Sequence, residues 1–438
     1  MRCCHEYWQT GPGVIAKGMS TSLLGVPGIV QRRFLPQPLT TAGLLALSAT
    51  ALTETARGAS GPGSEEKGTS LAKPLPNFLD SHERVSLAAL PKGATPEQTI
   101  AAIQRVAEAA TDFSWLSRGD VVFIKPASNS PHPYPATTSP LAVLAITRLL
   151  REKGAGRVIV GDKPGVEWVY QNKSRQRGSS RAILSKNGLH QAALESGAEV
   201  HYFDEAGYDA YFADQTEHKS HWRGELWFPS ILREVDHIVV LPRVSRHTLA
   251  GTTFGLKAAV GWLRDDSRLE LHRDARSFLE KAVEINDALV LRQKLRLVLS
   301  LGTKVQTTFG PDRGYTVEPD PGLVFGSESL LAHDMVALGW LLWNREQWTP
   351  AAQLVWYRDP YRAYPGALNR AFVGYTWGFK ELLASETYHS VPIHSVRTDP
   401  QLSHAASLQG GVPQIELEDV SNLLPEGIRN YLLEKATS

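Results

Sequence analysis

The sequence predicts an α/β protein built on a doubly wound, mostly parallel sheet with flanking helices and an aromatic-rich helical C-terminal segment. Three observations lead to this fold class. Short apolar runs bounded by Gly, Asp or Pro have the length and composition of buried strands. Amphipathic stretches of helical period separate most of these runs, as in parallel sheets whose strands are joined by helices. The chain has 438 residues, of which 42% are hydrophobic, so it can bury a large core.

The first predicted elements form a strand, helix and strand in succession. Residues 85–90 predict a strand, and residues 95–110 predict an amphipathic helix that begins at Thr95-Pro96, a favourable helix start. The apolar residues 121–125 predict a buried strand. The later predicted elements are a helix at 140–153, a strand at 157–161, a helix at 181–196, and strands at 199–203 and 235–241, followed by a helix at 256–263, a strand at 295–301 and a helix at 330–344.

The C-terminal part of the chain has a different composition. Aromatic residues become frequent after residue 345, and they predict helices that pack over the sheet or wall a pocket, with packing preferred. A last amphipathic helix is predicted at 421–435, with Ser421 as its cap. The aromatic residues are Trp348, Trp356, Tyr357, Tyr361, Tyr364, Tyr375 and Trp377.

Four regions are predicted along the chain. Residues 1–59 resemble a twin-arginine export signal, with Arg32-Arg33 ahead of an apolar stretch and a small-residue cleavage site at 49–51. An ordinary N-terminus with a chance arginine pair is the alternative, and Met19 is an alternative start. Residues 60–83 predict a linker, 84–345 the α/β domain, and 346–438 an extension that packs on it. The export signal predicts a periplasmic or other extracytoplasmic location, with the export machinery as a partner.

Composition excludes several classes of function. The 46 basic and 45 acidic side chains give a net charge of +1, which predicts neither nucleic acid nor a membrane surface as the main partner. The chain has two cysteines, Cys3 and Cys4, so a cysteine-ligated iron–sulfur cluster in the folded body is excluded, and the cofactor remains unknown. No apolar run is long enough for a membrane span in the mature chain. No P-loop, dinucleotide-binding fingerprint, nucleophile elbow or H-E-x-x-H motif is present.

Candidate site residues follow the predicted strands, because ligands of parallel α/β sheets bind outside the carboxyl ends of the strands. Arg243 and Arg246, with the Gly- and Thr-rich turn into the helix at 256–263, predict a cradle for a small anion, with His247 as the candidate acid or base. The alternative is a solvated loop followed by helix caps. The predicted ligand-binding residues are Lys125, Asn129, Arg243, Arg246, Thr252, Thr253 and Lys257, and the predicted catalytic residues are His247 and Asp162.

Two carboxylates are candidates for holding a divalent cation. Asp162 follows a predicted strand and Asp334 lies early in a predicted helix, and either could bind a metal or orient a histidine. Each is more often a cap or turn residue. His132, His247 and His272 could form a metal site only if the fold brings them together.

Five sequence blocks resemble, in order and spacing, the family called domain of unknown function 362. The main block is 239–261, which resembles the family's Pro-Lys-x-Lys-x-His segment followed by Lys-Asn-x-x-Gly. The other blocks are Ile124-Lys125-Pro126 with Thr138-Ser139-Pro140, then 160–165, then Gly310-Pro311 with Gly314, then Gly326-Ser327 with Ala332-His333-Asp334. Arg243, Ser245 and Arg246 stand where the family favours lysines, and Ala258 where it favours Asn. Many relatives also carry cysteine-rich ferredoxin-like segments, which this chain lacks.

These observations leave two main hypotheses for the function. The first is an enzyme, or an enzyme-like protein, that binds or processes a small anionic molecule at the carboxyl edge of the sheet. The second is a non-catalytic accessory protein of the cell envelope that docks a partner through its aromatic tail, which exposed Trp356, Tyr361 and Trp377 would favour. A relationship with lactate-racemase-like folds is a weaker third possibility, because the motifs match poorly. The family itself implies no settled reaction.

Overall fold

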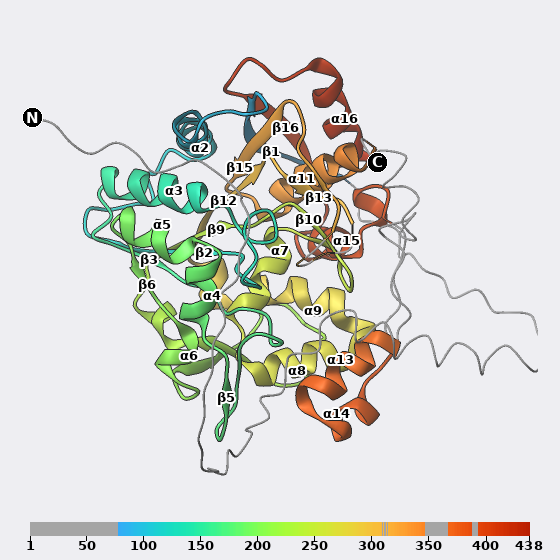
Figure 1. Cartoon of the computed structure of the whole chain (residues 1–438). Helices are drawn as coiled ribbons and strands as arrows, with labels where there is room; N and C mark the ends of the chain where they lie inside the picture. Colours follow the sequence, from blue (N-terminus) through green and yellow to red (C-terminus); the bar gives the residue numbers. More distant parts are fainter. Residues whose placement is uncertain (1–77, 309, 311, 313, 347–366, 388–392) are drawn as a thin grey trace, which may run out of the picture. The chain divides into compact units, whose positions relative to one another are not determined.

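The computed structural model describes residues 78–308, 310, 312, 314–346, 367–387 and 393–438, which all belong to one compact unit, Ser48–Ser438 (Figure 1). The predicted export signal, most of the predicted linker and five of the C-terminal aromatic residues lie outside these ranges. Among the helices described, none is long and apolar enough to cross a membrane.

An eight-stranded sheet forms the centre of the fold and confirms the predicted α/β class. Its strand order is β16-β1-β15-β12-β9-β2-β3-β6, and among these strands only β15 runs antiparallel to its neighbours. The strands are β1 Phe78–Leu90, β2 Val121–Pro126, β3 Arg157–Val160, β6 Glu199–Val200, β9 His237–Leu241, β12 Leu295–Gly302, β15 Gly322–Ser327 and β16 Val412–Asp419.

Both faces of the sheet are covered, because its central strands are apolar on both sides. In β2, Phe123 packs into the core on one face, whereas Val122 and Ile124 pack into the core on the other. Helices α2, α3 and α5 cover the second face, and α7, α11 and α15 lie on the first, with α9 packed on α7 and α15 (Figure 1). Helices on both faces are the doubly wound arrangement that the sequence predicted. The bounds are α2 Pro96–Ala110, α3 Pro140–Glu152, α5 Leu189–Glu195, α7 Gly255–Ala258, α9 Phe278–Glu284, α11 Leu330–Glu346 and α15 Pro400–Leu408.

The remaining elements lie around this framework. A small sheet of order β11-β10-β13-β14 follows the carboxyl end of β9, and two hairpins, β4-β5 and β7-β8, complete the strands described. These strands are β4 Tyr170–Gln171, β5 Gln176–Arg177, β7 Tyr211–Asp214, β8 Leu226–Pro229, β10 Ser245–His247, β11 Gly251–Thr253, β13 Val305–Gln306 and β14 Thr316–Val317. The other helices are α4 Ser180–Lys186, α6 Phe203–Ala206, α8 Asp265–Arg273, α10 Leu289–Arg292, α13 Ala367–Trp377, α14 Phe379–Ala384 and α16 Glu426–Thr437.

The predicted start of the α/β domain differs from the observed one. Strand β1 begins at Phe78, six residues before the predicted boundary at 84, because its first half pairs with β16, which comes from the C-terminal extension. The extension was predicted to be helical, and β16 therefore adds a strand that its sequence did not predict. This edge of the sheet forms by pairing of two strands that lie more than 300 residues apart in the sequence, a contact that local sequence patterns do not reveal.

Two predicted helices also differ in their limits. The helix predicted at 181–196 is two helices, since Asn187 ends α4 and its side chain donates hydrogen bonds to Ser128 Oγ and the Ser130 carbonyl. The last helix begins at Glu426 after Pro425, and Ser421 instead accepts the backbone N–H of Ala89 next to the sheet. In contrast, Thr95 caps α2 as predicted, in a reciprocal arrangement with Gln98.

Candidate functional site

Three adjacent parallel strands bring most of the predicted site residues to one edge of the sheet. Strands β9, β2 and β3 are neighbours, and Arg243, Lys125 and Asp162 lie at or just beyond their carboxyl ends. This convergence follows from the parallel arrangement. The position of these residues at the sheet edge agrees with the sequence-based expectation. All three side chains are buried, so they are not surface groups.

Lys125 and Asp162 form a buried ion pair. Lys125 Nζ lies 2.6 Å from Asp162 Oδ1 and also donates hydrogen bonds to the carbonyls of Pro126 and Ala258. Burial lowers the pKa of Lys125, and the negative charge of Asp162 opposes that shift. The other carboxylate oxygen of Asp162 accepts the backbone N–H of Ser128 at 2.5 Å. Both oxygens of Asp162 are therefore engaged inside the protein, which favours a structural role and leaves its catalytic role a prediction.

Gly261 is required beside this pair. A Cβ atom at this position would lie well inside van der Waals contact with Asp162 Oδ1 and Lys125 Nζ. Gly261 also accepts the backbone N–H of Lys163, whose ammonium forms a second buried ion pair with Asp265 at 2.8 Å. Burial lowers the pKa of Lys163 to about 8. The loop after β3 is thus tied to α8 and to the turn after α7.

The predicted anion cradle forms a basic cluster, which we define as Arg243, Arg246, His247 and Lys257 together with Arg268 from α8. Arg246 and His247 lie on β10, and Lys257 lies on α7. Arg243 is buried and donates a hydrogen bond to the carbonyl of Ala136, while Arg268 donates three hydrogen bonds to the carbonyls of Val260, Pro164 and Lys163.

His247 is held as a neutral ring. Its Nδ1 accepts the backbone N–H groups of Leu249 at 3.1 Å and Ala250 at 3.2 Å, so the ring proton must be on Nε2. Burial, followed by the positive charges of Lys257 and Arg243, lowers the pKa of His247 well below its ordinary value. The arrangement suits His247 to donate a hydrogen bond from Nε2 to a bound molecule, in preference to taking up a proton at neutral pH.

Lys257 differs from the other lysines of the site. Lys125 and Lys163 each have a carboxylate partner, whereas no ion pair of Lys257 is found within the described part of the chain. Burial lowers the pKa of Lys257 to about 7, and the positive charges of Arg243 and Arg268 contribute to the same shift. An amine with such a pKa is present in both its charged and neutral forms near neutral pH.

Two acidic groups lie near the basic cluster. The Glu167 side chain is exposed as a whole, but its carboxylate folds against Gly165, and the loss of water together with Asp312 raises its pKa to about 7. Asp312 accepts hydrogen bonds from Asn129 Nδ2 at 3.3 Å and from Trp168 Nε1 at 3.4 Å. Asn129, a predicted ligand, is therefore bound to this acidic side of the site.

The loop after β13 folds over β10. Gly310 packs so closely on the backbone carbonyl of Arg246 that a Cβ atom there would overlap it, and the Gly310 carbonyl accepts the N–H of Thr248 at 3.3 Å. This contact gives a physical reason for a glycine in the block that begins at Gly310, since any side chain would push the loop off β10.

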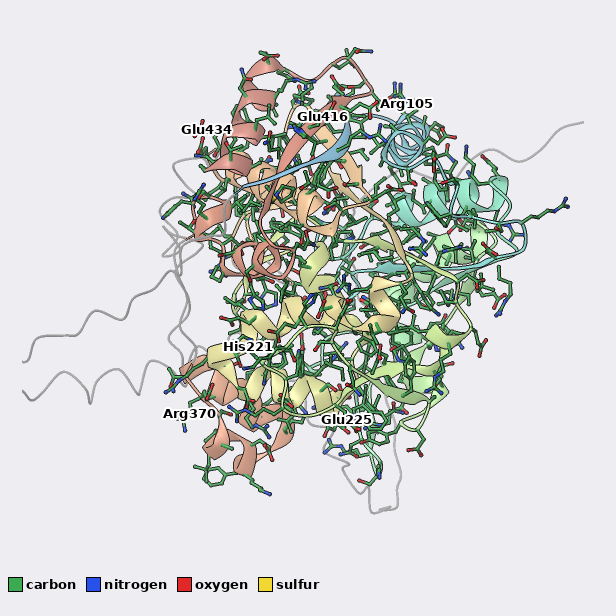
Figure 2. The ribbon with its side chains drawn as sticks, turned by 180° about the vertical axis from the view of Figure 1, so that it is seen from behind. Arg105, His221, Glu225, Arg370, Glu416 and Glu434 are labelled. Carbon is green, nitrogen blue, oxygen red and sulfur yellow. The ribbon has the colours of Figure 1, made fainter. Side chains whose placement is uncertain are left out.

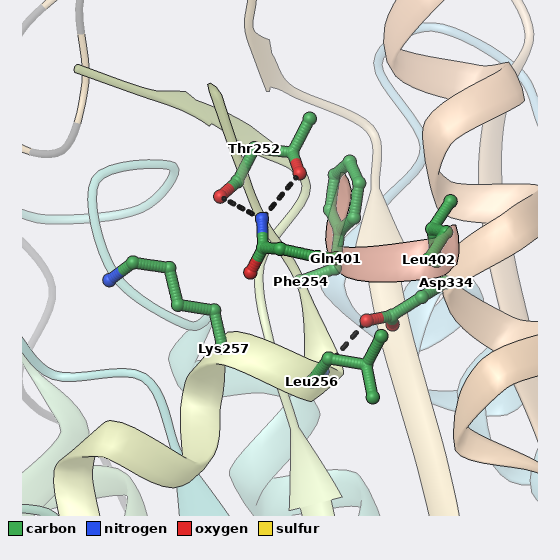
Figure 3. Close-up of a pocket in the computed structure, with 7 residues that line it drawn as sticks. All are labelled: Thr252, Phe254, Leu256, Lys257, Asp334, Gln401 and Leu402. Atoms are coloured by element: carbon green, nitrogen blue, oxygen red, sulfur yellow. Dashed lines mark hydrogen bonds between the residues drawn. The ribbon is translucent and has the colours of Figure 1, made fainter. Parts of the chain in front are cut away.

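The predicted threonines have partners within the protein. Thr252 Oγ1 donates to Asp399 Oδ2 at 3.0 Å. It also accepts from Gln401 Nε2 at 3.1 Å, which Figure 3 shows, so β11 is joined to Asp399 and α15. Thr253 is buried on β11, opposite Ser245. The space between these residues and α7 is too small to admit even a water molecule, so it is not a ligand cavity in this structure. The Lys257 side chain extends away from Asp334 and Leu256 in this view.

Asp334 acts as a helix cap. Its two oxygens accept the backbone N–H groups of Gly255 at 2.9 Å and Leu256 at 2.7 Å, at the start of α7. This geometry supports the cap that was the alternative to a metal ligand. His272 is packed among Phe278, Phe372 and Trp377, and His132 stacks edge-on with Trp168.

Several residues of the site were not predicted from the sequence. Lys163 and Asp312 lie within two of the family blocks but were not chosen as site residues, and Asp265, Arg268 and Glu167 lie in no block singled out in the sequence. The partners of these residues lie on other elements. Lys163 and Glu167 follow the same strand as Asp162, so a wider reading of that loop would have included both.

Comparison with known proteins identifies the family. Residues 122–339 match the family described as a domain of unknown function, DUF362. The chain carries a DUF362 domain and belongs to that family. The DUF362 match covers the central strands β2, β3, β9, β12 and β15 and all residues of the basic cluster, and it confirms the family that the five blocks resembled. It ends before α15, β16 and α16, so these elements extend the DUF362 domain in this protein.

Similar solved structures are distant. The apoprotein of lactate racemase from Thermoanaerobacterium thermosaccharolyticum is 13% identical, with a TM-score of 0.38, over 58% of this chain and 59% of that chain. A Thermotoga maritima protein is also 13% identical, with a TM-score of 0.34, over 53% of this chain and 55% of that chain. The DUF362 protein thus spans less than two thirds of either structure. No curated protein matches the sequence.

Proposed function

We propose that this DUF362 protein is an enzyme that binds a small anionic molecule at the basic cluster and transfers a proton with Lys257. The observation that carries the proposal is the state of Lys257. It is a half-buried amine with a pKa of about 7, it lies among guanidinium groups, and no carboxylate pairs with it in the described residues. Such an arrangement costs stability unless a ligand offsets it, and perturbed groups of this kind concentrate at functional sites.

The roles of the neighbouring groups follow from their chemistry. Arg243 and Arg246 remain charged at any working pH and can hold a carboxylate or phosphate, but they cannot act as bases. The neutral His247 can donate from Nε2 to the same anion. Lys257 in its neutral form can accept a proton from the bound molecule, and the ammonium can return it. The protein would act outside the cytoplasm if the N-terminal region is an export signal.

Variants of Lys257 test the proposal. We expect inorganic phosphate or oxalate to raise the thermal midpoint of the wild-type protein and to do so much less in Lys257→Met and Arg246→Ala. A concentration 100 times the Kd would stabilise the folded state by about 2.7 kcal/mol. Arg181→Gln is the matched control, because Arg181 pairs with Glu205 on the surface and lies outside the cluster.

The unliganded stability of Lys257→Met gives an independent result. The folded pKa of about 7 lies below the ordinary value of 10.5, so the unfolded chain binds more protons between these values. Wild-type stability should therefore rise with pH across this window through Lys257, and Lys257→Met should lose that rise and be at least as stable at pH 7. Equal anion binding by Lys257→Met and wild type would contradict the proposal.

The accessory-protein alternative keeps one supporting observation. On α13 and α14, Tyr375, Phe379 and Leu383 are exposed by 47%, 72% and 62%, whereas Trp377 is half-buried against His272. Trp356 and Tyr361 lie outside the described residues. Failure of both anions to bind, with normal folding, would favour this alternative.

A further inference from the structure

Two histidines and a glutamate from three separate segments converge away from the basic cluster. His221 lies between β7 and β8, Glu284 ends α9, and His404 lies on α15. Glu284 Oε1 is 2.6 Å from His221 Nδ1 and 2.9 Å from His404 Nε2, and the ligand atoms of the three residues lie within 4.8 Å of one another. We call these residues the His–Glu–His triad. Figure 2 labels His221 on the face seen from behind.

We propose that the His–Glu–His triad binds a divalent transition-metal ion, with zinc as the occupant. Two imidazole nitrogens and one carboxylate oxygen are a donor set that suits zinc and its neighbours and does not suit magnesium or calcium. The His221 side chain is 49% exposed, whereas that of Glu284 is 1% exposed. A metal here would therefore be bound by protein ligands on its buried side and could bind water as a fourth ligand on its solvent side. This inference does not depend on the function proposed above.

The observed distances fit a site that needs a small adjustment. Zinc bonds of about 2.0–2.1 Å in tetrahedral geometry place neighbouring ligand atoms about 3.3–3.4 Å apart. The two histidine nitrogens now lie at hydrogen-bonding distance from Glu284, so the nitrogen of His221 must move outward by roughly 0.7 Å and that of His404 by roughly 0.4 Å. Metal binding also replaces the proton that each ring donates to Glu284, and the ring proton then shifts to the other nitrogen.

A neighbouring pair provides a natural comparison. His218 donates its backbone N–H to Asp287 Oδ2 at 2.8 Å and places Nδ1 3.0 Å from Oδ1, just as His221 uses its backbone and ring on Glu284. The third group differs. Arg292 Nη1 lies 3.0 Å from Asp287 Oδ1, in the role that His404 Nε2 has at Glu284. A guanidinium cannot act as a metal ligand, so the chain contains the same half-site with and without a second histidine.

A metal at the triad would also connect two parts of the chain. His221 and Glu284 lie within the DUF362 match, whereas His404 lies beyond its end at residue 339. The ion would tie α15 of the C-terminal extension to α9 of the family domain. Because the three ligands come together only in the folded chain, binding must stabilise the folded state.

Zinc titration of the full chain, without a polyhistidine tag and after treatment with a chelator, tests this proposal. We measure affinity by competition with a chromogenic chelator and stoichiometry by native mass spectrometry. We expect one zinc ion per chain. Loss of a hydrogen-bond partner behind a ligand usually costs about 10–100-fold in affinity, so loss of a ligand should cost at least about 100-fold.

The variants are His221→Asn, His404→Asn and the matched control His218→Asn. His221 is exposed, so its variant should fold even if substitution of His404 on α15 disturbs packing. Supporting results are zinc affinity reduced in His221→Asn, retained in His218→Asn, and visible absorption of bound cobalt typical of four ligands. Zinc binding that is equal in His221→Asn and His218→Asn, or no stoichiometric zinc in the wild-type protein, would overturn the proposal.

Discussion

Replacing Asp162 by Asn should strongly destabilise the protein, because it leaves the buried ammonium of Lys125 without its counter-charge. Lys125 Nζ and Asp162 Oδ1 are 2.6 Å apart and both side chains are at most 5% exposed. If the Asn oxygen keeps the hydrogen bond from Ser128, its amide nitrogen faces the ammonium; in the other orientation it faces the Ser128 N–H. Removing one partner of a buried ion pair costs about 3–5 kcal/mol, which is the loss expected here.

The pH dependence gives the sign of the effect. Burial holds the pKa of Lys125 below its ordinary value of 10.5, and loss of Asp162 must lower it further. At a pH between the pKa of Lys125 in the folded variant and its ordinary value of 10.5, Lys125 binds more protons in the unfolded chain than in the folded one. The stability of Asp162→Asn should therefore rise as the pH rises toward 10.5. The deficit relative to wild type should therefore be smaller at about pH 9.5 than at about pH 7.

Urea denaturation followed by far-UV circular dichroism measures the effect, with two comparisons. Glu199→Gln breaks the surface pair with Arg157, whose side chains are 55% and 44% exposed, and should cost only about 0–1 kcal/mol. Lys125→Met combined with Asp162→Asn removes the uncompensated charge and should recover much of the loss. A cost for Asp162→Asn no larger than that for Glu199→Gln, or a double variant no more stable than Asp162→Asn, would refute the reasoning.

Two further substitutions test the packing and the charges around the site. Gly261→Ala places a methyl group against Asp162 and Lys125, and we expect a loss of about 3 kcal/mol in the same denaturation assay, whereas Gly427→Ala, where nothing lies near the added atom, should be tolerated. Asp399→Asn should remove a pH dependence: burial raises the Asp399 pKa to about 6 from 3.8, so wild-type stability falls as pH rises through this window. Because Asn also caps helices, α15 should persist in the variant, and an unchanged pH profile would contradict the assignment.

The sequence was sufficient to predict the part of the site that depends on strand order. Lys125, Asp162 and Arg243 lie at or just after three short apolar runs, and the sequence predicts a helix farther along the chain after each run. A parallel sheet therefore had to bring the carboxyl ends of these strands to one edge. The helix start at Thr95 was predictable for a similar reason, since a capping box depends on residues three positions apart.

The rest depends on contacts between distant segments. Asp334 caps α7 from a helix that begins 75 residues after it, and Asp265 pairs with Lys163 across about 100 residues, which local patterns do not encode. The His–Glu–His triad was missed for the same reason. The sequence offered Asp162 and Asp334 as metal candidates. The two histidines of the triad, His221 and His404, are 183 positions apart in the sequence, and only the fold brings them to Glu284.

The C-terminal extension is part of the folded framework and not merely an appendage, at least in the portion that the structure describes. Strand β16 completes one edge of the sheet, and α16 packs on α11. Gln401 and Asp399 bind Thr252 on β11, and β11 pairs with β10, which carries Arg246 and His247. Three residues further along α15, His404 reaches Glu284. Any ion that fixes His404 would thereby steady the helix that supports the basic cluster, so α15 physically connects the two proposed sites.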